Sequence, residues 1–314
     1  MNMKKRVLIF GATGELGGRI ARLAADAGYE VYGVSTGTRK NDLVDFSGVK
    51  MLQGNKYDNG FLQNICAPLK PNVIMDTVPK TESVDLYMKN FPFVSNVFFC
   101  SSTGTYVPLQ SLPATEQHPW MVETPCNFYF HCERDAYSLK MYHEKDFPVT
   151  IFRPTNIIGP ARVPLDLWGN RSIRFYKMLK AGQPLVIPRC EDIMLQSGYN
   201  WDLASAFVLA IGKPDAVRGE IFNISCKRAI PLGRYLKTAM EYLKSSSEIS
   251  HAEPEELQKL YPDEICMHWG LDFLLLHMCF DISKAEKILG YSPARTTQEG
   301  LIKTLEWLES TGQL

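Results

Sequence analysis

The residues with the clearest chemical meaning are three glycines near the start of the chain. Gly11, Gly14 and Gly17 follow a short apolar run, Val7–Phe10, and precede a helix-like stretch at Arg19–Gly28. Glycines allow a sharp turn and close approach of a pyrophosphate, while a helix N-terminus offers free N–H groups and the positive end of the helix dipole. The order of strand, glycine turn and helix predicts a dinucleotide-binding site, with an ordinary glycine turn as the alternative.

The end of the second apolar run bears on the choice of cofactor. An acidic residue at this point would bind the adenosine ribose and favour NAD. The sequence instead has Ser35, Thr36 and Arg39, with no acid from residue 35 to residue 40. Small hydroxyls and a cation suit a 2′-phosphate, so we expect NADP, with NAD still possible. The alternative is that Arg39 and its neighbour Lys40 belong to a plain solvated loop.

Strands and helices that could position these residues are expected to alternate along the first half of the chain. Apolar runs without polar alternation are typical of parallel strands covered on both faces. The expected strands are Val7–Phe10, Glu30–Ser35, Lys50–Gly54, Asn72–Val78, Asn96–Ser102 and Val149–Arg153. This pattern predicts an α/β fold with a doubly wound parallel (Rossmann) sheet over residues 1–155. Residues 156–314 are expected to form a smaller, mixed substrate-binding portion, with elements such as Gly219–Ile224 returning to the sheet.

The composition fits an enzyme-sized chain with no special affinity for polyanions. The 314 residues are 45% hydrophobic, and Lys+Arg and Asp+Glu both total 34, so the formal net charge is zero. We therefore expect a small-molecule substrate and no nucleic-acid partner. No apolar run reaches membrane length, so no membrane partner is expected. Oligomeric state is left open.

The eight cysteines are scattered and form no C-x-x-C pair. In a chain of this size the arrangement is typical of reduced thiols, which predicts a cytoplasmic location. We expect no metal site.

Several motifs occur in an order that resembles the extended short-chain dehydrogenase/reductase family, in its NAD(P)-dependent epimerase/dehydratase group. They are G-A-T-G-E-L-G at Gly11–Gly17, C-S-S-T-G-T-Y at Cys100–Tyr106, Tyr129 at the head of a helix, R-P-T-N-I-I-G-P at Arg153–Pro160, W-D-L-A-S-A-F at Trp201–Phe207 and F-D-I-S-K-A-E-K-I-L-G at Phe280–Gly290. Together with the glycine turn, the resemblance implies that the cofactor contacts Gly11, Thr13, Gly14, Glu15, Leu16, Gly17, Ser35, Thr36, Arg39, Asn55, Thr77, Val78, Pro79, Pro154, Asn156 and Ile157.

The catalytic pattern of that family is broken in this chain. The resemblance implies that Ser102 binds the substrate oxygen and that Tyr129 begins the family's Y-x-x-x-K pattern, but Glu133 stands where lysine is expected. A nearby carboxylate disfavours a tyrosine phenolate, although it could accept hydrogen bonds from ribose hydroxyls. The alternatives are that Ser102 only caps a strand end and that Glu133 is solvated, with the local alignment shifted. His131 or Cys132 could be substitute proton carriers, or could merely pack.

The substrate-binding portion also departs from the pattern of the family members that act on sugar nucleotides. The resemblance implies that those members hold a diphosphate with two arginines. Neither the stretch 194–202 nor the stretch 277–280 contains an arginine, so we expect a small, non-nucleotide substrate. Other arginines could bind a smaller anion or could lie on the surface: Arg162, Arg171, Arg174 and Arg189.

Two functions therefore stay open. One is an atypical NAD(P)-dependent oxidoreductase or epimerase. The other is a cofactor-binding protein without turnover, acting as a sensor or an RNA-associated partner, because residues 196–207 and 219–225 are similar to the chloroplast stem-loop-binding proteins. The neutral net charge counts against RNA binding.

Overall fold

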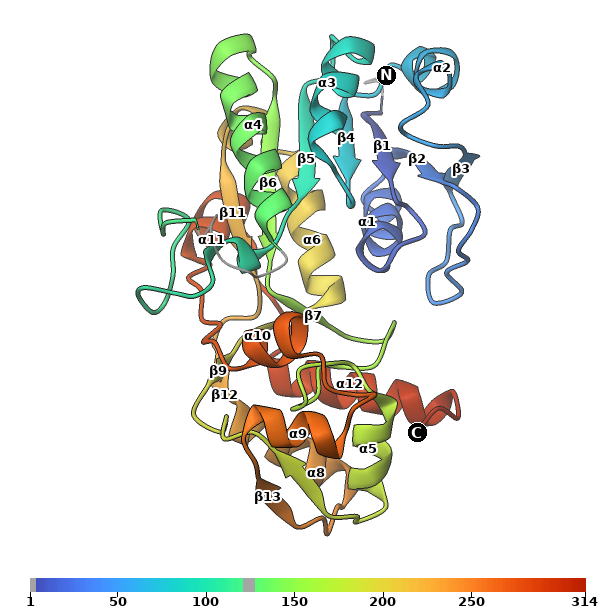
Figure 1. Ribbon diagram of the computed structural model, residues 1–314. Helices are drawn as coiled ribbons and strands as arrows, with labels where there is room; N and C mark the ends of the chain where they lie inside the picture. Colours follow the sequence, from blue (N-terminus) through green and yellow to red (C-terminus); the bar gives the residue numbers. More distant parts are fainter. Residues whose placement is uncertain (1–3, 121–127) are drawn as a thin grey trace.

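A seven-stranded parallel sheet forms the centre of the computed structural model, which describes residues 4–120 and 128–314 (Figure 1). The strands lie in the order β11-β6-β5-β4-β1-β2-β3. The chain adds β2 and β3 on one side of β1 and then crosses over to add β4 on the other side, so the strand order reverses between β1 and β4. Ligands of doubly wound sheets bind beyond the carboxyl ends of the strands at such a reversal. The strands are β1 (Arg6–Phe10), β2 (Glu30–Ser35), β3 (Val49–Gln53), β4 (Val73–Asp76), β5 (Asn96–Cys100), β6 (Val149–Pro154) and β11 (Ile221–Ile224).

Helices cover both faces of this sheet, and this explains why the strands are apolar without alternation. One face packs against α1 (Glu15–Asp26), α6 (Asn200–Ile211) and α11 (Ser283–Leu289). The other face packs against η1 (Leu62–Cys66), α3 (Thr81–Asn90) and α4 (Tyr129–Lys145). The short α2 (Asn59–Phe61) leads into η1, η2 (Ala67–Leu69) follows it, and α7 (Pro214–Val217) follows α6.

A smaller C-terminal lobe lies beyond the carboxyl ends of the strands (Figure 1). It has its own apolar core, which includes Trp168, Tyr176 and Tyr235. Its helices are α5 (Ile173–Lys180), α8 (Leu232–Leu243), α9 (Pro254–Leu260), η4 (Met267–Leu271), α10 (Asp272–Leu274) and α12 (Thr297–Ser310). Its strands pair as β7 (Asn156–Ile158) with β10 (Ser197–Tyr199), β8 (Leu185–Ile187) with β13 (Ile249–His251), and β9 (Met194–Leu195) with β12 (Ile230–Pro231).

The predicted fold class is confirmed, and the expected return to the sheet occurs as β11, which pairs with β6 in parallel. The helix expected to begin at Tyr129 corresponds to α4. Helix α12 was not predicted, but its capping box of Thr296 and Glu299 was a readable signal. No helix in the described ranges is long and apolar enough to cross a bilayer.

A buried ionic cluster joins α4 to the carboxyl ends of β5 and β6. Asp135 on α4 is fully buried and accepts hydrogen bonds from Arg134 (2.5 Å to Oδ1), Arg153 (2.9 Å to Oδ2) and Ser101 (2.6 Å to Oδ2). Both arginines are at most 1% exposed. Burial raises the pKa of Asp135, but Arg134 and Arg153 outweigh this effect and hold that pKa below its ordinary value.

We expect Asp135→Asn to destabilise the protein by about 3–5 kcal/mol, because it leaves two buried arginines without their counter-charge. Urea unfolding at pH 7 measures this loss. The matched control is Asp146→Asn, which removes an exposed ion pair with Arg218 and should cost at most about 1 kcal/mol. Equal midpoints for the two variants would contradict the prediction.

The carboxylate of Asp135 also makes the free energy of unfolding depend on pH. Because its folded pKa is lowered, its stabilisation is present above the unfolded pKa of about 3.9 and is lost as the pH falls through the folded pKa. In urea unfolding at a series of pH values, the variant Asp135→Asn should lose less stability than the wild-type protein as the pH falls through this range.

Candidate functional site

The glycine turn has a backbone geometry that larger residues could not adopt. Gly11 has a φ of +78°, and a Cβ there would lie 2.4 Å from Thr77 Oγ1. A Cβ on Gly17 would lie 2.1 Å from the carbonyl oxygen of Gly11. Helix α1 begins directly after Gly14, and no side chain caps it. The turn is therefore too tight for residues larger than glycine at these two positions, and it leaves the uncapped N–H groups at the start of α1 available to a ligand.

A cavity of about 280 Å³ lies beside this turn. It brings together predicted residues from β1, β2, β3 and β4, and thereby joins the glycine turn to the acid-free end of β2. The predicted residues that line it are Gly11, Thr13, Gly14, Ser35, Thr36, Arg39, Asn55, Thr77 and Val78.

Lys56 also lines this cavity and was missed by the sequence analysis. Its Nζ lies 2.7 Å from both carboxylate oxygens of Asp76 and donates to the carbonyl of Val78 at 2.6 Å. Asp76 in turn accepts a hydrogen bond from the hydroxyl of Tyr87 at 2.8 Å. Burial lowers the pKa of Lys56 despite the attraction of Asp76. The pair fixes the turn after β4, and no local motif announces it, because its partners are 20 residues apart.

The carboxylate of Glu15, at the start of α1, is neutralised by the chain itself. Arg162 lies 2.9 Å from Glu15 Oε2, and Asn200 donates to Oε1 at 3.3 Å. Arg19 donates to the Glu15 carbonyl at 2.7 Å. An uncompensated carboxylate beside a pyrophosphate would repel it, so these cations make the predicted phosphate position electrostatically acceptable.

Of the four arginines predicted as anion ligands, Arg162 and Arg171 lie near the glycine turn. Burial and the like charge of Arg162 lower the pKa of Arg171 to about 10. Arg171 also donates to Asn156 Oδ1 at 2.7 Å and to the Ile157 carbonyl at 3.2 Å. The remaining two lie elsewhere, with Arg174 facing Glu264 and Arg189 exposed.

The other predicted cofactor contacts do not line this cavity. Leu16 is buried in the core, and the carbonyl of Pro79 accepts a hydrogen bond from Arg134 at 3.2 Å. The carbonyl of Pro154 accepts from Thr103 at 3.3 Å, and the amide of Asn156 donates to Ser197 at 2.8 Å. The chain thus holds the segment after β6 through contacts to the C-terminal lobe.

The three predicted catalytic residues lie at the carboxyl ends of the sheet, but not all of them point inward. Ser102 follows β5, and its Oγ accepts a hydrogen bond from the N–H of Gly104 at 3.0 Å, as a cap of η3 (Thr103–Tyr106). Tyr129 is 51% exposed at the first residue of α4, and Glu133 is exposed one turn later. The hydrogen bond and negative charge of Glu133 raise the pKa of Tyr129.

The inward side of this helix carries His131, Cys132 and Arg134. Arg134 Nη1 lies 2.9 Å from His131 Nδ1 and donates to the carbonyl of Pro79. Cys132 is buried, with its thiol 3.9 Å from the Thr105 carbonyl. In the family pattern Y-x-x-x-K, a shift of one residue would put Phe130 and Arg134 in place of tyrosine and lysine. Arg134 is buried, whereas Phe130 and Tyr129 are exposed to the same extent, at 50% and 51%. The alignment through Tyr129 and Glu133 stays a prediction.

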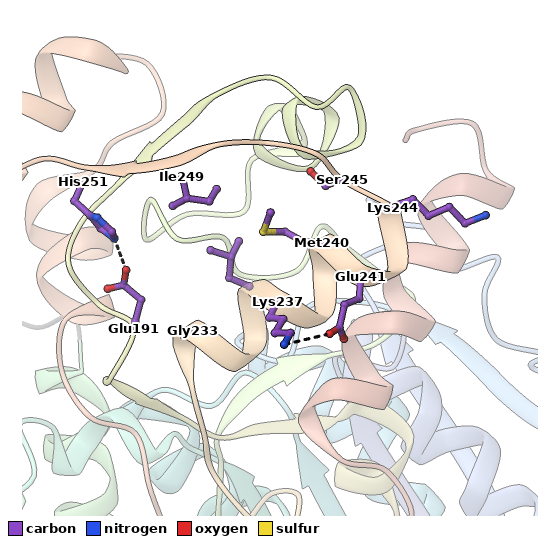
Figure 2. Close-up of a pocket in the computed structure, with 10 residues that line it drawn as sticks. Glu191, Gly233, Lys237, Met240, Glu241, Lys244, Ser245, Ile249 and His251 are labelled. Carbon is purple, nitrogen blue, oxygen red and sulfur yellow. Dashed lines mark hydrogen bonds and ion pairs between the residues drawn. The ribbon is translucent and has the colours of Figure 1, made fainter.

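A larger cavity, of about 630 Å³, lies in the C-terminal lobe between α8 and β13 (Figure 2). His251 and Glu191 contact each other across one end, and Lys237 pairs with Glu241 at 3.8 Å. Its charged groups are thus largely paired, and none of the predicted site residues lines it. Among the described residues, no cluster of His, Cys, Asp and Glu side chains is arranged to hold a metal ion.

Comparisons with known proteins agree with this geometry. Residues 87–225 match the model of the NAD dependent epimerase/dehydratase family, and residues 3–81 match that of the NmrA-like family. The "Chloroplast stem-loop binding protein of 41 kDa b" of Arabidopsis thaliana is 27% identical over 327 residues, which cover 95% of this chain and 78% of that protein. That name places the relative in the chloroplast, so a cytoplasmic location for this chain stays a prediction.

Solved structures share the fold over nearly the whole chain. A UDP-glucose 4-epimerase of Thermotoga maritima, solved with UDP-glucose, superposes with a TM-score of 0.75 at 17% identity, covering 98% of this chain and 99% of that one. A dTDP-glucose 4,6-dehydratase of Bacillus anthracis, solved with NAD, gives 0.75 at 16% identity, covering 98% of each chain. The predicted resemblance to the epimerase/dehydratase family is confirmed.

The contact between Tyr129 and Glu133 can be tested directly. We expect Glu133→Gln to lower the pKa of Tyr129, because the substitution removes the negative charge that disfavours the phenolate. Phenolate absorbance is followed against pH, each protein being compared with its own Tyr129→Phe counterpart. The control is Glu144→Gln, which removes an exposed charge at the other end of α4. An unchanged Tyr129 titration in Glu133→Gln would contradict the contact.

Proposed function

We propose that this chain, whose central residues match the NAD-dependent epimerase/dehydratase family, binds NADP and acts as an atypical oxidoreductase or epimerase on a small, non-nucleotide substrate. The observation that carries the proposal is the cavity that joins the glycine turn to the end of β2. Ser35, Thr36 and Arg39 line it there, and no acidic residue does. This lining favours a 2′-phosphate over free ribose hydroxyls.

The residues present fit a dinucleotide along its length. Because Gly11 and Gly17 carry no Cβ, the turn closes tightly against Thr77 and against its own backbone, and its N–H groups can approach a pyrophosphate. Asn55 lines the same cavity and can hydrogen-bond the edge of an adenine ring. The nicotinamide would then lie beyond Thr77 and Val78, at the carboxyl ends of β4 and β5. When bound, the nicotinamide supplies or accepts a hydride. The chain contributes binding, orientation and hydrogen bonds to the substrate oxygen.

The substrate is proposed to be small because the two diphosphate-binding arginines implied by the resemblance are missing. Arg162 and Arg171 leave an excess of positive charge near the glycine turn, even after Glu15 is counted. This favours a substrate with a carboxylate or phosphate group. Ser102 is the proposed ligand of its reacting oxygen. Tyr129 and Glu133 would take part only if the start of α4 turned inward.

A second candidate function is a cofactor-binding protein without turnover that associates with RNA. It is favoured by the similarity to a relative named as a stem-loop binding protein and by the exposure of Tyr129. Two measurements distinguish the two functions: fluorescence anisotropy with a labelled RNA stem-loop at two salt concentrations, and an assay for turnover of bound NADPH. RNA binding that weakens steeply with salt, together with no turnover of bound NADPH, would support the second function.

We expect tighter binding of NADPH than of NADH, measured by calorimetry at fixed salt. A charge-assisted hydrogen bond contributes about 1.5–3 kcal/mol, so Arg39→Ala should weaken NADPH binding about 10- to 100-fold and leave NADH binding nearly unchanged. The matched control is Lys40→Ala, which removes the neighbouring cation that does not line the cavity. Equal affinities for the two cofactors in the wild-type protein would contradict the preference for NADP.

We also expect Gly14→Val to abolish binding of both cofactors, because its branched side chain would fill the space beside the turn. Even a Cβ at this position lies 3.1 Å from the Gly11 carbonyl oxygen. Calorimetry is repeated on a variant whose circular dichroism matches that of the wild type, with Gly28→Ala as a control outside the cavity. A folded Gly14→Val protein with unchanged affinity would place the cofactor elsewhere.

A further inference from the structure

The side of α4 that faces the sheet's carboxyl edge holds a histidine and an arginine in direct contact. Arg134 Nη1 donates to the Pro79 carbonyl at 3.2 Å and lies 2.9 Å from His131 Nδ1. The remaining guanidinium nitrogens, Nε and Nη2, donate to Asp135 at 3.1 and 2.5 Å. Arg134 is therefore fixed on both sides, and it brings His131 to the end of β4 where the nicotinamide is expected.

This contact determines where the histidine carries its proton. A guanidinium has only donors, so His131 Nδ1 must be the acceptor and the ring proton must lie on Nε2. Burial and the positive charge of Arg134 lower the pKa of His131 to about 4, and the ring is neutral near pH 7. The other charges that act on the ring are Asp135, which raises its pKa, and Arg153, which lowers it.

The ring is also held in orientation by aromatic neighbours. Phe130 lies 4.3 Å from it between ring centroids, and Phe128 lies 5.8 Å from it in a stacked arrangement. Phe128 in turn contacts Phe273 of the C-terminal lobe at 5.4 Å. Within the described residues, none accepts a hydrogen bond from His131 Nε2. A fixed donor without a partner thus lies at the junction of the sheet and the smaller lobe.

We infer that the Nε2–H of His131 is the hydrogen-bond donor for a carbonyl oxygen bound at the nicotinamide end of the site, with Arg134 as its positioning residue. The inference rests on the proposed function and deepens it. A neutral imidazole whose Nδ1 accepts from a guanidinium polarises a carbonyl but does not give up its proton, since that would leave an imidazolate. The carbonyl oxygen belongs either to the carboxamide of the cofactor or to a small substrate.

The test is nitrogen-15 NMR of histidine-labelled protein at pH 7, with the His131 signals identified by their loss in His131→Gln. The exposed His143, on the same helix, is the internal reference. We expect an unprotonated Nδ1 and a protonated Nε2 for His131. Arg134→Met should lose this single tautomer, and Arg134→Lys should retain it, which also covers a failure of the methionine variant to fold. An imidazolium, or a proton on Nδ1, would overturn the inference.

Ligand titrations place the donor and distinguish the two sources of the carbonyl. Adenosine 2′,5′-bisphosphate, which lacks the nicotinamide, should leave the Nε2 proton signal unchanged. A shift with NADP identifies the cofactor carboxamide as the acceptor. A further shift on adding dihydroxyacetone phosphate to the NADP complex identifies a substrate carbonyl. If NADP binds by calorimetry but neither addition moves the signal, the inference fails. If NADP does not bind, the proposed cofactor function fails and the tautomer result still stands.

Discussion

The buried carboxylate of Asp135 is the interaction on which the arrangement of the site depends. It lies between the guanidinium groups of Arg134 and Arg153 and accepts the hydroxyl proton of Ser101, so α4, β5 and β6 meet at one fully buried point. Arg153 also stacks its guanidinium 4.5 Å from the ring of Tyr106 and 4.2 Å from that of Trp120. Replacing a single charged member would leave a buried charge uncompensated, so the cluster tolerates neither substitution nor a change of geometry.

The same cluster determines which side chains of α4 can face a ligand. Because Arg134 and Asp135 point inward, helical periodicity turns Glu133 outward, and the first turn presents His131 toward the sheet. In the proposed function, the neutral imidazole of His131 and the guanidinium of Arg134 take the place of the tyrosine and lysine of the family pattern. Such a pair binds and polarises an oxygen well but exchanges protons poorly. This chemistry is compatible with a slow or specialised enzyme and with a sensor of bound cofactor.

At the adenosine end, the site is made mainly of backbone and small side chains. The turn at Gly11 is tight, because a Cβ there would collide with Thr77, and the ion pair of Lys56 with Asp76 holds the neighbouring turn in place. The carboxylate of Glu15 works against an anion, and Arg162 compensates for it. In the proposed complex the two ends of the cofactor therefore meet different surroundings: a tight glycine turn at the adenosine end, and residues that depart from the family pattern at the nicotinamide end.

The sheet, the glycine turn and most of the residues that line the cavity beside it could be predicted from the sequence. These depend on local signals: apolar runs, glycine spacing and the absence of an acid after β2. The sequence also left open a shifted alignment at Glu133. Which side of α4 is buried could not be predicted from the sequence, because it depends on Arg153 and Ser101, which are distant in sequence. The partnership of Lys56 with Asp76 was hidden for the same reason: Lys56 lies in the turn after β3 and Asp76 at the end of β4, and only the sheet brings the two charges together.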